Sequence, residues 1–263
     1  MSTRVVVVGA LGRMGEALRR AFADEADLEI AAGVERPGHP GLGSPCGSGQ
    51  VVAHLGEILA QVDVVVDFAL SDGVAERARA SADAGRCYVC GVTGLDDAAW
   101  QELRTAAMRV PVVYAPNFSI GINVLCRLVG VARQLLSAEY DVEVVEVHHR
   151  AKSDAPSGTA ARLVEAVIEA AEVNRVRNGR CGLVGAKEAG EVGIHSVRTG
   201  DVVGDHTVVF GGPGERIELT HRATSREAFA RGVAASVRFC VGHEPGLYGM
   251  PDVLGASHES PRA

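Results

Sequence analysis

The sequence predicts an α/β fold in two domains. The first is a doubly wound parallel sheet, and the second is an α+β domain with a mixed, mostly antiparallel sheet. Up to residue 117, short β-branched runs alternate with helical stretches, as in βαβ units. Near residue 118 the pattern changes to longer runs with partial alternation. A chain of 263 residues is long enough for two such domains.

The first domain is expected over residues 1–117, with residues 226–263 returning to it. Val5–Val8 is an uninterrupted β-branched run, which suits a strand buried on both faces. A helix over about 13–23 and a strand at 28–34 follow, and then a Gly- and Pro-rich loop from 37 to about 50. The alternation resumes with strands at 62–68, 87–91 and 110–115 and helices at about 72–84 and 96–108.

The second domain is expected over residues 118–225. Within it, 141–149 is a predicted strand whose apolar positions change phase, from Val142 and Val144 to Val145 and Val147. We interpret this change as a bulge or as burial on both faces. The other elements are helices at about 120–137 and 158–173, strands at 193–199, 204–210 and 215–223, and a last helix at about 225–241.

Composition excludes several classes of protein. With 26 basic against 33 acidic residues, the net charge is −7, and this argues against a nucleic-acid partner. Hydrophobic residues make up 47% and aromatic residues only 4%, which predicts an aliphatic core. The absence of a signal peptide or a long apolar run predicts a soluble, cytoplasmic protein without a membrane partner. Cys87 and Cys90 have redox or zinc spacing, but they lie in a predicted strand, and we interpret them as buried thiols.

A glycine-rich turn links the first strand to the first helix, with the sequence Gly9-Ala10-Leu11-Gly12-Arg13-Met14-Gly15. Small residues let the backbone approach a pyrophosphate, and a helix N-terminus offers free N–H groups to it. The spacing is G-x-x-G-x-x-G instead of the commoner G-x-G-x-x-G. Its position still predicts a Rossmann-type dinucleotide-binding domain. The alternative is a βα turn that binds nothing.

Glu35 and Arg36 end the second strand and bear on the choice of cofactor. Glu35 can accept from ribose hydroxyls and Arg36 can meet a 2′-phosphate, so NADH and NADPH both remain candidates. Ligands of such folds bind beyond the carboxyl ends of the strands. The cofactor site is therefore expected to include Phe68, Gly91, Val92, Thr93, Ala115, Pro116, Asn117 and Phe118. Each of these can instead be a turn or core residue.

The densest polar segment runs from His148 to Ala160. His148 and His149 can act as acid or base, and Lys152 supplies a cation or a proton. The next helix opens with Ser157, Gly158 and Thr159, whose N–H groups and hydroxyls suit a carboxylate. The segment therefore predicts a site for a small anionic substrate, and the alternative is a solvated, capped loop.

A metal site of His148, His149 and Asp154 is a further interpretation of this segment. Adjacent histidines on a strand point to opposite faces, which argues against joint ligation. We therefore predict no metal site.

Glu146–Ala160 resembles, without a gap, the signature E-x-H-H-x-x-K-x-D-A-P-S-G-T-A of the 4-hydroxy-tetrahydrodipicolinate reductase (dihydrodipicolinate reductase) family. Further motifs of that family are matched at Gly9–Gly15, Gly91–Gly94, Ala115–Gly121 and Val197–Thr207. The resemblance covers essentially the whole chain and ends near residue 254.

The resemblance implies NAD(P)H-dependent reduction of 4-hydroxy-tetrahydrodipicolinate to tetrahydrodipicolinate, with loss of water, in lysine and diaminopimelate biosynthesis. It also implies a homotetramer, with the second domain binding substrate and forming the assembly. By motif position, His148 would be the proton donor and acceptor, and Lys152 would be a proton donor. The dicarboxylate substrate would be held by His149, Ser157, Gly158 and Thr159. The residues from Gly9 to Met14, Glu35, Arg36, 91–93 and 115–118 would contact NADPH or NADH.

Three features depart from the family pattern. Ala69 and Val92 stand where the family often has Thr, and the loop after Arg36 looks shorter. They leave the cofactor preference open. Two alternatives remain, a reductase of another cyclic imine or unsaturated dicarboxylate and a nucleotide-binding regulator without catalysis. The intact His148 and Lys152 argue against both.

Overall fold

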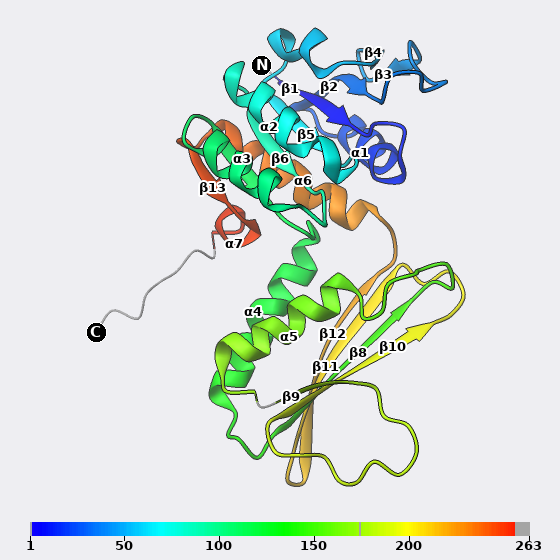
Figure 1. Ribbon diagram of the computed structural model, residues 1–263, viewed down its shortest axis with the longest axis vertical. Helices are drawn as coiled ribbons and strands as arrows, with labels where there is room; N and C mark the ends of the chain where they lie inside the picture. Colours follow the sequence, from blue (N-terminus) through cyan, green and yellow to red (C-terminus); the bar gives the residue numbers. More distant parts are fainter. Residues whose placement is uncertain (1, 174, 256–263) are drawn as a thin grey trace. The chain divides into compact units, whose positions relative to one another are not determined.

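The computed structural model describes residues 2–173 and 175–255. Contacts divide them into two units (Figure 1). One unit holds residues up to Ile120 and those from Arg226 onward, and the other holds Gly121–Ser225. The predicted fold class is confirmed, since the first unit contains a mostly parallel sheet between helices and the second a mixed sheet. Within the described residues, no helix has the length and apolar character needed to span a membrane.

The sheet of the first unit has the strand order β13-β7-β6-β5-β1-β2-β4-β3. From β1 the chain adds β2 on one side and later β5 on the other, so the direction of winding reverses at β1. A cofactor crevice is expected at the carboxyl ends around such a switch point. The strands are β1 (Thr3–Val8), β2 (Leu28–Val34), β3 (Pro45–Cys46), β4 (Gly49–Val52), β5 (Val64–Asp67), β6 (Cys87–Cys90), β7 (Pro111–Tyr114) and β13 (Gly246–Tyr248).

Helices cover both faces of this sheet. Buried residues of α1 (Arg13–Ala23) and α6 (Glu227–Val241) share one apolar cluster with the sheet, and those of α2 (Val74–Asp83) and α3 (Asp97–Ala107) share another. This explains why Val5–Val8 is apolar at every position, because both faces of β1 are buried. The remaining short elements are η1 (Leu55–Glu57), η2 (Leu59–Gln61), η3 (Ser71–Gly73) and α7 (Met250–Val253).

The expected loop from residue 37 to about 50 is partly wrong, because it contains the hairpin of β3 and β4. These strands are short and carry Gly and Pro, so they lack a periodic apolar pattern. Two isolated apolar side chains, Cys46 and Val51, are nevertheless buried. The short β13, which pairs in parallel with β7, was likewise not predicted.

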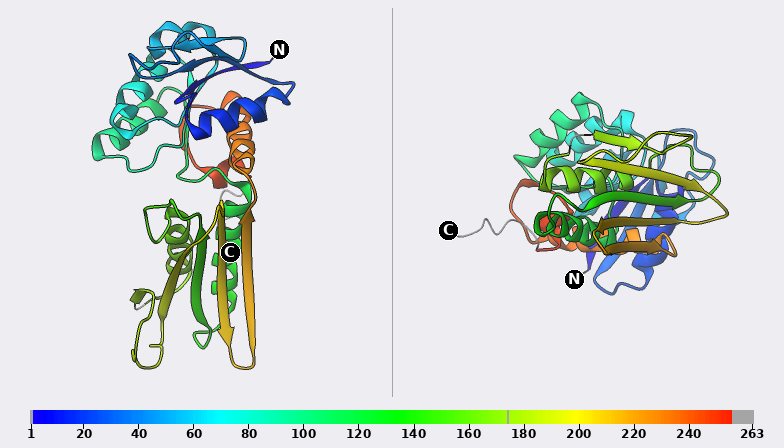
Figure 2. Two further views of the ribbon diagram at one scale, coloured as in Figure 1. Left: turned by 90° about the vertical axis from the view of Figure 1, so that its right-hand side faces the viewer. Right: turned by 90° about the horizontal axis from the view of Figure 1, so that it is seen from below.

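The five-stranded sheet of the second unit has the order β12-β11-β8-β10-β9. Its pairs β8–β11 and β11–β12 are antiparallel, but β8–β10 and β10–β9 are parallel, so the strand predicted at 193–199 does not pair in the expected antiparallel sense. Helices α4 and α5 lie along one face (Figure 2). The elements are α4 (Ile120–Leu135), β8 (Asp141–His148), α5 (Gly158–Ala170), β9 (Arg175–Asn178), β10 (Glu191–Arg198), β11 (Gly204–Gly212) and β12 (Glu215–Ala223).

Neither the bulge nor the burial on both faces that could explain the change of phase in β8 is found in its described pairings and burial. The register of β8 with β10 and with β11 runs without a break, and burial alternates strictly along the strand. The buried face begins with Val142 and Val144 and continues with Glu146 and His148. The apparent change of phase therefore reflects two polar side chains on the buried face.

Candidate active site

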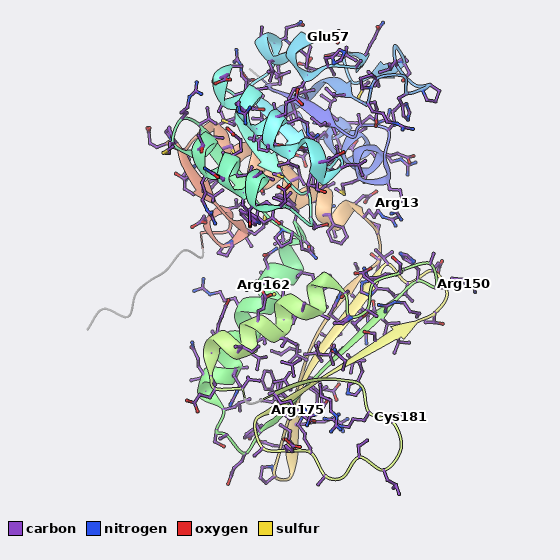
Figure 3. The ribbon with its side chains drawn as sticks, in the orientation of Figure 1. Arg13, Glu57, Arg150, Arg162, Arg175 and Cys181 are labelled. Carbon is purple, nitrogen blue, oxygen red and sulfur yellow. The ribbon has the colours of Figure 1, made fainter. Side chains whose placement is uncertain are left out.

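The glycine turn after β1 is folded as a phosphate-binding turn requires. Gly9 has φ +77°, a conformation that favours glycine. Gly15 lies so close to the turn that a Cβ there would come within 2.4 Å of the Gly9 carbonyl oxygen. Arg13 begins α1 and is exposed (Figure 3). Glycine at position 15 therefore lets α1 pack directly against the turn.

Glu35 lies directly beside this turn. Its Oε1 atom accepts a hydrogen bond from the backbone N–H of Leu11, at 2.9 Å. The bond fixes a carboxylate between the ends of β1 and β2, where a ribose would lie next to a bound pyrophosphate. Arg36, the next residue, is exposed. The structure therefore places Glu35 and Arg36, the two residues that bear on the choice between NADH and NADPH, at the edge of the sheet that carries the glycine turn.

The ends of β5, β6 and β7 supply the remaining predicted cofactor residues. The rings of Phe68 and Phe118 meet edge to face, with centroids 5.7 Å apart. Gly91 packs against Phe68, since a Cβ there would come within 2.1 Å of that ring. Thr93 and Pro116 are exposed, and the Asn117 Oδ1 atom accepts from the N–H of Ser119, at 2.8 Å. By contrast, the side chains of Val92, Ala115 and Phe118 belong to the core.

Asp67 anchors this edge and was not singled out from the sequence. It is fully buried, pairs with Arg77 Nε at 2.6 Å and accepts from the N–H of Ala69 and the hydroxyl of Tyr88. Burial and the carboxylate raise the pKa of Tyr88 well above its usual value. In the sequence, this buried carboxylate is indicated by one acidic residue inside the otherwise apolar run Val64–Phe68. Buried charges are retained only when they are paired, so a cationic partner is expected for it.

The polar cluster of the second unit is built by strand register. Glu146 and His148 are two residues apart on β8 and so share its buried face. The parallel neighbour β10 places Arg198 beside His148, and the antiparallel neighbour β11 places His206 opposite Glu146. Three strands therefore bring four polar side chains to one end of the sheet.

Glu146 is the centre of this cluster. It is fully buried and accepts two hydrogen bonds of 2.8 Å from the guanidinium of Arg198. It also lies 2.5 Å from Nδ1 of His148 and accepts from the N–H of Ser157, at 3.2 Å. Burial alone would raise the pKa of Glu146, but the bonds from Arg198 and His148 outweigh it and lower the pKa to about 2. Glu146 is therefore a carboxylate at neutral pH.

The two buried histidines of the cluster are held in their neutral forms. Burial lowers the pKa of His148 despite its bond to Glu146, and the cations Lys152 and Arg198 act in the same direction. Burial, and then the neighbouring His148, lower the pKa of His206 to about 3. The rings of the two histidines meet edge to face at 5.0 Å. Of the two rings, His148 is the less buried, with 8% of the residue exposed against 3% for His206.

The start of α5 closes the cluster. Ser157 is the N-cap, with its hydroxyl accepting from the N–H of Ala160 at 3.1 Å and lying 3.2 Å from Nε2 of His206. Ser157 is thus buried, whereas Gly158 is exposed and Thr159 is half-buried. Of the three carboxylate-binding residues predicted at the start of α5, Gly158 and Thr159 are the accessible ones.

The loop between β8 and α5 carries the other predicted residues. Lys152 Nζ lies 2.8 Å from a carboxylate oxygen of Asp154. His149, the first residue after β8, is half-exposed, while His148 at the end of the strand is buried. Within the described residues, no group of three or more His, Cys, Asp and Glu side chains is placed to hold a metal ion.

All six cysteines lie in the described part and are free thiols. Cys87–Cys90 is strand β6, as predicted. Burial raises the pKa of Cys90 to about 12, which makes a reactive thiolate there unfavourable.

Sequence reasoning assigned no role to Glu146, Arg198 or His206. Each lies inside a quoted motif, but their meeting depends on the pairing of strands that are about 50 residues apart in the chain. The available signal was the polar pair Glu146 and His148 at the i and i+2 positions of an otherwise apolar strand.

Known proteins are similar to this chain over nearly its full length. The family "Dihydrodipicolinate reductase, N-terminus" matches residues 3–118, and "Dihydrodipicolinate reductase, C-terminus" matches residues 121–254. A 4-hydroxy-tetrahydrodipicolinate reductase of Anaeromyxobacter dehalogenans is 46% identical, over 96% of this chain and 98% of the relative. That of Myxococcus xanthus is 42% identical, over 98% and 99%.

A solved structure is also similar. It is a dipicolinate-bound dihydrodipicolinate reductase from Paenisporosarcina sp. TG-14, with a TM-score of 0.80 and 26% identity, covering 96% of this chain and 99% of the other. The matches span both units and include the motifs that form the glycine turn and the polar cluster. The chain therefore belongs to the dihydrodipicolinate reductase family.

Proposed function

We propose that this protein reduces 4-hydroxy-tetrahydrodipicolinate to tetrahydrodipicolinate, as an NAD(P)H-dependent oxidoreductase of lysine and diaminopimelate biosynthesis. The observation that carries the proposal is the uninterrupted segment Glu146–Ala160, folded into a buried acid–base cluster in a chain of this family. In the net reaction the substrate gains a hydride and a proton and loses water. The protein must therefore hold a hydride donor, bind two carboxylates and supply protons.

The first unit is the dinucleotide-binding domain in this proposal. The positive φ of Gly9 and the close packing of the turn against α1 that Gly15 allows suit a pyrophosphate at the N-terminus of α1, and Glu35 suits a ribose hydroxyl. NADH or NADPH bound there supplies the hydride. Exposed Arg36 would meet the 2′-phosphate of NADPH. Residues 9–14, 91–93 and 115–118, with Phe68, complete the site.

The second unit binds the substrate in this proposal. A helix N-terminus attracts a carboxylate, and Gly158 and Thr159 lie at the accessible start of α5. His149 and Lys152 add donors from the preceding loop. Ser157 shapes this site through its cap and its contact with His206. The dipicolinate carried by the structurally similar relative is itself a cyclic dicarboxylate, which supports this substrate class.

His148 is the proton donor and acceptor, and Lys152 is a proton donor. Loss of the hydroxyl as water takes up one proton at the leaving oxygen and releases one from the substrate, and a further proton completes the reduction after hydride transfer, so the net uptake is one proton. The lowered pKa of His148 makes its charged form a ready donor. Lys152 stays close to Asp154 and is positioned on the same loop.

A homotetramer is the assembly we infer. Within the described residues of the second unit, helices cover only one face of the sheet (Figure 2). The other face includes Val145, Val147 and Val197, and Val197 is 42% exposed. The edge strand β12 exposes Ile217 and a row of unpaired backbone groups. Light scattering should give the mass of four chains, and a monomer in solution would contradict the inference.

The direct test of function uses the freshly formed condensation product of pyruvate and aspartate-semialdehyde. Wild-type protein should oxidise NADH or NADPH in its presence, followed by absorbance, and should not do so with either precursor alone. The absence of oxidation with both cofactors would overturn the proposed function.

A further inference from the structure

The carboxylate of Glu146 carries an inference beyond the motif residues. It is fully buried, so it is not available to a substrate, and its described contacts are all internal. Burying a carboxylate is costly, and apolar replacements of buried ion pairs are often neutral or stabilising. Stability alone therefore does not explain why this strand position holds a charge.

Its contact with His148 has a chemical consequence. An ionised carboxylate can only accept hydrogen bonds, so Nδ1 of His148, 2.5 Å away, must carry a hydrogen. The neutral ring then presents the lone pair of Nε2. That atom lies beside Gly204, where a Cβ would come within 2.9 Å of it, so glycine keeps the surroundings of Nε2 open.

Arg198 connects this pair to the loop that carries Lys152. One guanidinium nitrogen donates to Glu146 at 2.8 Å and also to the backbone carbonyl of Asp154, at 2.6 Å. The Asp154 side chain in turn pairs with Lys152. A planar guanidinium can hold both groups at fixed angles, which a lysine cannot. The orientation of His148 and the placement of Lys152 are thus linked through one side chain.

We propose that Glu146, gripped by Arg198, is a positioning residue that fixes His148 in the tautomer with Nδ1 protonated, so that Nε2 is the atom that exchanges protons with the substrate. The inference rests on the proposed function for the identity of the substrate. The tautomer of His148 is a property of the free protein, so that part of the inference does not depend on the proposed function.

The first measurement needs no variant. The ring-nitrogen chemical shifts of His148 in NMR, at a pH where the ring is neutral, should report a protonated Nδ1 and an unprotonated Nε2. The opposite tautomer, or an even mixture, would overturn the proposal. This result is independent of turnover. A wild-type protein that shows the expected tautomer but no reductase activity would contradict the proposed function and would still support the proposed tautomer.

The second measurement compares Glu146→Gln with Glu143→Gln. Glu143 lies on the same strand and also pairs with an arginine and a histidine, Arg180 and His195, but it is on the opposite face. An amide can donate as well as accept a hydrogen bond, so both tautomers of His148 should be populated in Glu146→Gln. We expect kcat to fall about 100-fold or more, with KM changed little. Glu143→Gln should keep wild-type kcat.

Arg198→Lys completes the series, because it keeps the positive charge but cannot form the two parallel hydrogen bonds to Glu146. We expect an intermediate fall in kcat with a shifted tautomer equilibrium. If Glu146→Gln is folded, has the wild-type tautomer and turns over at the wild-type rate, the pair is structural only and the proposal is wrong.

Discussion

The carboxylate of Glu35 accepts a hydrogen bond from the backbone N–H of Leu11, which ties the end of β2 to the glycine turn after β1. Arg36 follows it and is exposed. This arrangement makes a cofactor-specific prediction. Arg36→Ala should weaken NADPH binding about 10-fold, the scale of one charge-assisted hydrogen bond, and leave NADH binding nearly unchanged. Fluorescence titration of both cofactors measures this, and equal losses for the two would contradict the assigned role.

Gly15 predicts a steric effect on the same turn. In Gly15→Ala, the new methyl group would approach the Gly9 carbonyl oxygen to 2.4 Å, so the turn or α1 must shift. We expect a loss of about 1–3 kcal/mol in the free energy of unfolding and weaker binding of both cofactors. Gly56→Ala is the control, since a Cβ there meets nothing within 4 Å. A Gly15→Ala protein with wild-type stability and cofactor affinity would refute the close packing.

The buried His206 predicts how stability depends on pH. Its pKa is lowered from 6.5 to about 3 by burial and by His148. The unfolded chain therefore binds the proton first as the pH falls. The stabilising contribution is complete above pH 6.5 and decreases on acidification by about 1.4 kcal/mol per pH unit.

Urea unfolding between pH 6.5 and 4.5 tests this, because the buried carboxylate Glu146, with an ordinary pKa of 4.5, contributes little in that window. In His206→Gln, whose amide can reach Ser157 as Nε2 does, the slope of unfolding free energy against pH should be smaller than in wild type. An unchanged slope would show that His206 is not held neutral by the fold.

Lys152 predicts a loss of turnover that a neighbouring cation does not share. Lys152→Ala should lower kcat about 100-fold, the usual scale for a positioned proton donor. Arg150 is exposed on the same loop and points away from the strands, so Arg150→Ala should keep kcat within a few-fold (Figure 3). Equal effects of the two substitutions would mean that the loop contributes only its general positive charge.

The sequence was most informative where function depends on local spacing. The turn from Gly9 to Gly15 is contiguous, and its position between a strand and a helix predicts a dinucleotide-binding domain. The segment His148–Thr159 is likewise contiguous. Both segments can be recognised in the sequence because the backbone N–H groups that bind an anion at a helix start belong to consecutive residues.

The partners of His148 could not be predicted in the same way. Arg198 and His206 reach it through the register of β10 and β11, which depends on packing along the whole sheet. The buried Glu146 interrupts the apolar series of Val142 and Val144, and the sequence alone shows this only as a change of phase in the strand. A charged residue on the buried face of a strand weakens the apolar pattern from which the strand and its buried face are predicted. In this protein it does so at the polar cluster itself.

The measurement that tests the central claim most directly is the turnover of His148→Gln. Our account predicts that kcat falls about 100-fold or more, while binding of NADH or NADPH to the separate unit built on β1 and α1 keeps its wild-type affinity. Turnover close to that of wild type would contradict the assignment of His148 as the group that exchanges protons with the substrate.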